Sequence, residues 1–409
     1  MGRSSALGAF NFEVESAWGE TNTTFTSRVA VLDSVDPSGL THDKMPAART
    51  VQYLQDYTHP VRGVMGGSFR TRLWLPGHGS TTAGAITVEE LETLLGYVFG
   101  NVTSTGSGTT ATAGATTTTI PTAAASGLTA GGIVFVGSLG DSGGAGQAAV
   151  VSSHAGSSLS LLTALPAAPA NGAVVASSYC IYPNETASSA TVPTIRALLL
   201  TANQQYACHG CYPQSVTIEG LSPGEVPSIV VEWGVSWWEP MAATFPTSNT
   251  VDTHNPAPSA AGSFFIQNRG TTTRQTYDVR ELRVSIDLNT IVKRGPGGLN
   301  QYQAVTGAVR GGMSVEVSFV VDAESATTSP TWPGRWDSDS QDYHVLATWS
   351  GAATGRRGAL YIPNACIVGA KPVQFSNNGI NAERVTLRAK TGPTTTSELT
   401  LSAFRLALG

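Results

Sequence analysis

The segment Cys208-His-Gly-Cys-Tyr-Pro-Gln214 leads into Ser215-Val-Thr-Ile-Glu-Gly-Leu221 and, after the break Ser222-Pro-Gly-Glu225, into a second arm from Val226 to Trp238. Apolar and polar residues alternate along both arms. Alternation with a period of two on both sides of a Pro-Gly break is typical of a β-hairpin. Each arm has one apolar face, so the hairpin requires a second layer of structure to cover it. The apolar positions are Val216, Ile218, Ile229, Val231, Trp233, Val235 and Trp237.

The composition is poor in charge. Charged residues make up 12% of the 409 residues, against about 25% in ordinary soluble proteins. Such a surface is typical of a secreted protein, or of a subunit that buries much of its surface in contacts with other subunits. The net charge of −5 argues against a general nucleic-acid binder. Because the sequence has neither an apolar signal segment nor a membrane span, we expect a soluble protein made in a cytosol.

Strand patterns recur along the chain. Residues 10–35 predict two strands, and 192–200 fit either a short helix or a strand. The best helix pattern is 87–99, where Thr87 can cap the first turn and Glu90 completes a capping box. The sequence therefore predicts a mainly β fold, a sandwich or barrel with one flanking helix. Further strands are predicted at 61–75, 281–288, 313–321, 344–349, 358–362, 383–389 and 399–408.

Residues 101–185 differ in composition from their flanks. They contain no Lys or Arg, and Asp141 is the one charged residue before Glu185. Short apolar runs separated by turn signals predict a small β-barrel or sandwich inserted into a discontinuous main domain, 1–100 and 186–409. Residues 36–60 are polar and fit an extended arm, or an ordinary surface loop. A loop of this length in a compact chain commonly binds something.

One motif resembles a protease nucleophile. Gly140-Asp-Ser-Gly-Gly144 carries the letters that surround the serine of chymotrypsin-like proteases. That chemistry needs a histidine to take the serine proton and an aspartate to orient the histidine. The upstream histidines, His42, His59 and His78, lie outside the sequence context of that family, and Asp-Ser-Gly-Gly is also good turn chemistry. We therefore interpret the motif as a turn.

Two further groups could bind metal ions. Cys208 and Cys211 form half a zinc site or a redox pair, but a structural zinc needs four ligands and the chain has no second pair. We interpret them as structural residues at a strand entry, with a disulfide or an opportunistic metal as the alternative. Asp337, Asp339 and Asp342 could surround calcium, yet the turn glycine and closing glutamate are missing. The sequence predicts no catalytic residue, no metal site and no cofactor, and therefore no enzyme.

The order of features resembles the tail tube (major tail) proteins of long-tailed bacteriophages. The resemblance covers most of the chain outside 36–60 and is one of pattern, with no invariant motif. It is carried by Pro60-Val-Arg-Gly-Val-Met65, Arg70-Thr-Arg-Leu-Trp-Leu-Pro76, Leu94-Leu-Gly-Tyr-Val-Phe-Gly100, Gly210-Cys-Tyr-Pro-Gln-Ser-Val-Thr-Ile218, the run 227–238, Ala359-Leu-Tyr-Ile-Pro-Asn-Ala-Cys366 and Leu401-Ser-Ala-Phe-Arg-Leu-Ala-Leu-Gly409. The low charge and the Thr-rich run 103–127 depart from it.

The resemblance implies a homohexameric ring whose inner strands close a barrel. Rings stacked head-to-tail would form the hollow tube of the virion tail, assembled in the host cytoplasm with other tail proteins and away from membranes. Phage DNA would pass through the lumen without specific binding, because an acidic ring repels phosphate. We expect the 36–60 arm between rings and the 101–185 insertion outside the tube. Candidate subunit or lumen contacts are Lys44, Arg49, Tyr53, Thr217, Glu219, Glu232 and Ser236.

Two other classes compete with this hypothesis. One is another repeating virion component, such as a capsid decoration or baseplate protein. The other is a secreted β-rich carbohydrate-binding module or hydrolase. Hollow tubes or six-fold rings in the microscope would favour the tail tube, whereas a stable monomer with hydrolytic activity that is lost in Ser142→Ala would favour the protease interpretation.

Overall fold

The computed structural model describes most of the chain, including a large sheet and a six-stranded sheet. The described residues are 9–20, 25, 27–28, 32–42, 45–46, 60–61, 65–75, 90–124, 127–137, 147–184, 192–201, 204–221, 225–241, 263–268, 274–277, 279–293, 305, 307–322, 342–350, 357–374, 381–391 and 397–409.

The predicted hairpin lies at the centre of the large sheet. Strands β17 (Gln204–Glu219) and β18 (Ser228–Val235) pair antiparallel, with Ser215 opposite Glu232. Gly220 begins the turn with φ of 72°, a left-handed conformation that glycine adopts without a steric penalty. The apolar alternation therefore produces the strands that it predicts.

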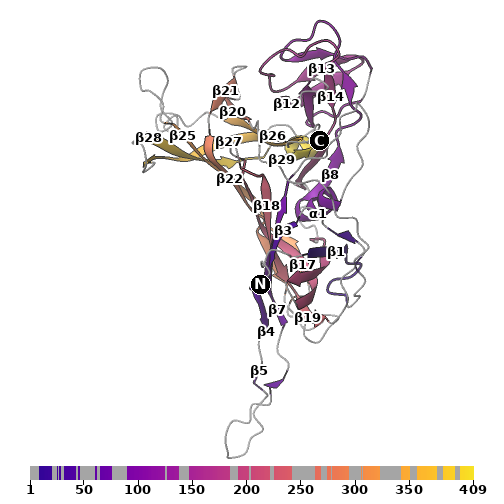
Figure 1. Ribbon diagram of the computed structural model, residues 1–409, viewed down its shortest axis with the longest axis vertical. Coiled ribbons are helices and arrows are strands. Elements are labelled where there is room, and N and C mark those ends of the chain that lie inside the picture. The colour runs from indigo at the N-terminus through magenta and orange to yellow at the C-terminus, as the bar shows by residue number, and fades with distance from the viewer. Residues whose placement is uncertain are drawn as a thin grey trace, which may run out of the picture.

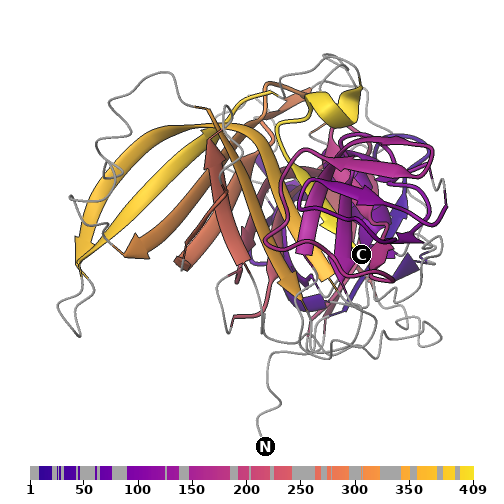
Figure 2. The ribbon, with the colours of Figure 1, turned by 90° about the horizontal axis from the view of Figure 1, so that it is seen from above.

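Strands on both sides extend the hairpin into one long antiparallel path (Figure 1). β18 pairs with β7 and β7 with β3, while β17 pairs with β22 and the path continues through β25, β28 and the distal half of β27. Figure 2 shows how strongly this path curves. The added strands are β3 (Leu32–Asp36), β7 (Met65–Trp74), β22 (Val279–Asp287), β25 (Ser314–Asp322), β27 (Arg357–Gln374) and β28 (Asn381–Ala389).

Long strands change partners where they are irregular. The ladder of β17 shifts register between Pro213 and Ser215, and its first half pairs instead with β16 and β19. The first half of β27 pairs with β26 and β29. A β-bulge bends a strand and increases its twist, so these strands turn one sheet into two layers. The second set comprises β1 (Ala9–Val14), β2 (Ser27–Arg28), β8 (Gly100–Ser104), β15 (Tyr179–Pro183), β16 (Ile195–Thr201), β19 (Trp237–Met241), β20 (Ser263–Asn268), β21 (Arg274–Tyr277), β26 (Tyr343–Ser350) and β29 (Arg405–Leu408). The short strand β4 (Leu40–His42) belongs to the first path, because it pairs with β7.

The main core lies between these layers and is covered on one side by the helix. Trp233 is buried against Phe69, with ring centroids 6.1 Å apart, and its indole Nε1–H donates to Thr71 Oγ1 at 3.0 Å. Helix α1 (Glu90–Phe99) buries the apolar face that its pattern predicted. Fully burying one such side chain contributes about 1.5–3 kcal/mol. The mainly β fold with a flanking helix is therefore confirmed; residues 81–89, including Thr87, lie outside the described part.

An arginine from a hairpin distant in sequence donates hydrogen bonds to the free carbonyl groups at the C-terminal end of α1. Strands β23 (Thr290–Lys293) and β24 (Gly307–Arg310) form a separate two-stranded ladder. The Arg310 guanidinium donates to the carbonyl oxygens of Tyr97, Val98 and Phe99. These carbonyls have no partner within a helix, and a cation suits the negative end of its dipole. Burial lowers the Arg310 pKa to about 10.

A six-stranded sheet lies within the predicted insertion. One of its faces carries a core of its own, including Val134, Val136 and Leu159, while the other packs Ile133 and Phe135 against the large sheet. The insertion begins and ends in β8 and β15, which belong to the large sheet. Its strands, in spatial order, are β10 (Thr119–Pro121), β13 (Ser158–Leu161), β12 (Gln147–Ala155), β11 (Ile133–Gly137), β14 (Val174–Ala176) and β9 (Thr109–Thr110).

Three segments refine the sequence prediction. Residues 399–408 are not one strand: helix α3 (Glu398–Leu401) precedes β29, because the Ser397 hydroxyl and carbonyl cap its first amides. Residues 195–201 are a strand rather than a helix. In the predicted arm, β5 (Met45–Pro46) pairs with β6 (Pro60–Val61), at one tip of the molecule in Figure 1. Among the described residues, no helix has the length and apolar character needed to cross a membrane.

Candidate functional site

One face of the curved sheet is lined with charged side chains. In β22, Arg283 and Ser285 are exposed whereas Leu282 and Val284 are buried, because successive residues of a strand point to opposite sides. The same alternation runs through β3, β7, β18, β17, β25 and β28. We call the outward side of these seven strands the polar face. Its charged side chains include Asp33, Asp36, Arg70, Arg72, Glu219, Glu232, Glu281, Arg283, Asp287, Glu316, Arg384 and Arg388.

The strand register arranges the polar face in rows. One row runs from Asp36 to Arg70 and Glu232, and then through Ser215 to Asp287. Residues directly opposite each other on adjacent strands interact, and opposite charges stabilise the pair. The row therefore alternates in sign over its first three strands.

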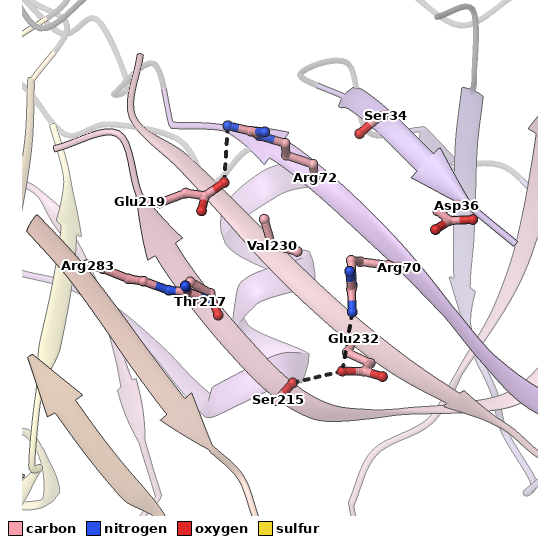
Figure 3. Close-up of a pocket in the computed structure, with 10 residues that line it drawn as sticks. All are labelled: Ser34, Asp36, Arg70, Arg72, Ser215, Thr217, Glu219, Val230, Glu232 and Arg283. Carbon is pink, nitrogen blue, oxygen red and sulfur yellow. Dashed lines mark hydrogen bonds and ion pairs between the residues drawn. The ribbon is translucent and has the colours of Figure 1, made fainter. Parts of the chain in front are cut away.

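Most arginines of the polar face have a carboxylate partner. Arg72 lies 3.1 Å from Glu219 and 3.4 Å from Asp33, and Arg70 lies 4.0 Å from Glu232 (Figure 3). Further along the sheet, Arg384 lies 2.7 Å from Glu281 and Arg388 lies 2.6 Å from Glu316. Exposed pairs of this kind contribute little stability because solvent screens them. Their main effect is to balance charge locally.

A hollow of about 510 Å³ lies over β7, β18 and β17. The side chains of Arg70, Arg72 and Arg283 line it together with Glu219 and Glu232. Figure 3 shows the Arg283 side chain reaching over Thr217. Among the described residues of the polar face, Arg283 is the one arginine without a carboxylate partner. The hollow thus presents one uncompensated guanidinium among paired charges.

The structure brings three of the predicted contact residues together. Thr217, Glu219 and Glu232 all lie on the polar face and line the hollow. Ser236 does not: it is fully buried, accepts a hydrogen bond from Trp18 Nε1 at 2.9 Å and donates to the Gly210 carbonyl. Ser236 therefore lies in the subunit interior, where its hydroxyl contacts Trp18 and Gly210, and is not on the surface where the sequence pattern placed it. Lys44, Arg49 and Tyr53 lie outside the described residues.

The Cys-His-Gly-Cys motif lies in the interior of the subunit. Cys208 and Cys211 are buried, unbridged thiols, and burial together with Cys208 raises the pKa of Cys211 well above its usual value. Between them, Gly210 has φ of 59° and its amide donates to Glu15 at 2.7 Å. A buried thiol of high pKa is inert, so the strand-entry interpretation fits this environment.

The sequence did not reveal a buried polar cluster beside this motif. His209 stacks on Trp237 with ring centroids 3.9 Å apart, and burial lowers the pKa of His209 to about 4. Glu20 pairs with the guanidinium of Arg196 nearby. No local signal connects these residues, because they come from the chain start, β16, β17 and β19.

The other motifs supply no site in the described part. Residues 138–146, 337 and 339 lie outside it, and Asp342 pairs with Lys390 at 2.9 Å. Among the described residues, no three metal-ligating side chains lie close enough together to hold an ion.

Comparisons with known proteins give a partial likeness. No known family matches the chain, and no curated protein matches it. Part of the chain is structurally similar to a chain in the cryo-EM structure of the anti-feeding prophage (AFP) baseplate, 6-fold symmetrised. The match covers 34% of this chain and 94% of the AFP chain, with 13% sequence identity and a TM-score of 0.26. At this level it is a partial likeness in chain path and defines no family.

Proposed function

We propose that the chain is a structural subunit of a phage-like tail, in which six copies form a ring and stacked rings form a hollow tube. The observation that carries the proposal is the curved sheet with one apolar and one charged face. The apolar face is covered by the subunit's own core. The polar face would line the channel, where carboxylates outnumber guanidiniums and would repel the DNA backbone. We assign no reaction to the chain.

The ends of the sheet support this assembly. In the described part, β3 pairs with β7 alone, and residues 366–374 of β27 pair with β28 alone. Such edges present unpaired amide and carbonyl groups, which act as templates for another strand. Val368 on the β27 edge leaves 37% of its surface exposed. Closing the ring by pairing these edges between neighbours would remove both of them.

Electron microscopy of the purified full chain tests the proposal. We expect six-fold rings or hollow tubes of uniform diameter. Rings that never stack would instead favour a baseplate or other virion component. A stable monomer at high protein concentration would contradict the proposal and revive the secreted-module alternative.

An edge variant sharpens this test. Val368→Lys places a charge on the exposed edge, where natural proteins use lysine to block strand pairing. We expect folded subunits that no longer form rings, measured by light scattering and circular dichroism. Leu162→Lys is the matched control, because Leu162 is 46% exposed directly after β13, away from the β3 and β27 edges. Equal assembly of the two variants would contradict the role of the β27 edge.

A further inference from the structure

The arginines of the polar face differ in whether a carboxylate lies beside them. Arg70, Arg384 and Arg388 each lie within 4.0 Å of a glutamate on an adjacent strand, and Arg72 lies between two carboxylates. Arg283 has no such partner in the described part of the chain. The cross-strand register sets this difference, since Ser318 of β25 lies opposite Arg283, and Glu219 of β17 is already engaged by Arg72.

An arginine that is paired with a carboxylate is less available to bind a polyanion such as DNA. A free guanidinium binds phosphate with two parallel N–H donors. A guanidinium paired with a carboxylate carries little net charge. DNA binding is driven by the counterions that are released when an arginine neutralises a phosphate. An arginine that is paired with a carboxylate does not contribute to this release. A surface whose arginines are paired with carboxylates therefore has low affinity for DNA.

We propose that the polar face contacts the phosphate backbone of passing duplex DNA through one guanidinium per subunit, Arg283, while the glutamates hold the other arginines away from phosphate. The proposal rests on the tail-tube function. Arg283 lies beside Thr217 in the hollow (Figure 3), and a threonine hydroxyl also donates to phosphate oxygens. Six copies would give a ring of isolated weak contacts. We call Glu232, Glu281 and Glu316 the masking residues, because their carboxylates pair with Arg70, Arg384 and Arg388.

Freeing the masked arginines tests the proposal. The triple variant Glu232→Gln, Glu281→Gln and Glu316→Gln removes the carboxylates that form ion pairs with Arg70, Arg384 and Arg388, while Asp36 stays opposite Arg70. Binding of a short fluorescent DNA duplex by the purified full chain is measured by anisotropy between about 20 and 150 mM salt. We expect affinity at low salt at least tenfold above wild type, with a salt slope steeper by about 0.9 for each freed arginine.

The matched control changes the same net charge elsewhere. Glu13→Gln, Glu90→Gln and Glu239→Gln lie on β1, α1 and β19, away from the polar face. This control should bind DNA as weakly as wild type. Equal binding by both triple variants, or wild-type binding as tight as that of the masking triple, would overturn the proposal. Thermal melting of every variant shows whether the subunit is folded.

A second variant, Arg283→Ala, tests whether Arg283 itself contacts phosphate. In the masking-triple background it should reduce the salt slope by about 0.9. An unchanged slope would show that Arg283 does not touch phosphate. Microscopy of the same preparations separates the two proposals: tubes with no gain in DNA binding would reject the masking idea alone. A gain in DNA binding without rings or tubes would reject the tail-tube function alone.

Discussion

The large sheet and the six-stranded sheet place their side chains in opposite ways. The polar face of the large sheet exposes paired charges, whereas the six-stranded sheet buries apolar side chains on both faces, in its own core and against the large sheet. Residues 101–184 carry a single charge, Asp141. Antiparallel sheets usually have one solvated face. From this difference we expect the six-stranded sheet to depend on the large sheet for stability, whereas the polar face is left exposed by the subunit's own core.

The largest expected effect comes from removing a large side chain from the apolar cluster between the two sheets, which we call the joint. Phe135 is fully buried there, among residues of both sheets. Phe135→Ala should cost about 3–5 kcal/mol, because a large cavity forms where neither sheet can easily collapse. Chemical denaturation should show the six-stranded sheet unfolding before the large sheet. One unchanged cooperative transition would show that the joint is not where the six-stranded sheet gains its stability.

A smaller effect is expected at Arg405, the buried cation of the same joint. It is 2% exposed, donates to the Gly131 carbonyl at 2.7 Å and to that of Thr400 at 3.1 Å, and its guanidinium lies 5.2 Å from the Tyr361 ring centroid. Arg405→Met should cost about 2 kcal/mol because buried carbonyls lose their donor. Denaturant midpoints measure the loss. A variant as stable as wild type would show that Arg405 only fills space.

The smallest effect is expected on the polar face. Glu219→Gln removes one half-exposed carboxylate partner of Arg72, which keeps Asp33. The free energy of unfolding should fall by less than about 1 kcal/mol. The same denaturation experiment measures it beside Arg405→Met. A loss as large as that at the joint would mean that these pairs support the fold, and the contrast between the two regions would disappear.

The candidate site was only partly predictable. Alternation placed Thr217, Glu219 and Glu232 on one side of the hairpin, and it also exposed Arg70 and Arg283 in their own strands. It could not show that Arg70 faces Glu232, since that pairing joins strands far apart in the chain. Ser236 was misplaced for the same reason: its partner Trp18 comes from the chain start.

The sequence by itself determined most of the strands, helix α1 and the two faces of those strands. These follow from the pleat of the backbone, which sends successive side chains to opposite sides and needs only neighbouring residues. Only the tertiary structure decided which strands are neighbours, which arginines are paired, and that Arg310 and Arg405 are buried. Those outcomes depend on register between distant strands, which is fixed by packing the whole sheet and leaves no local signal.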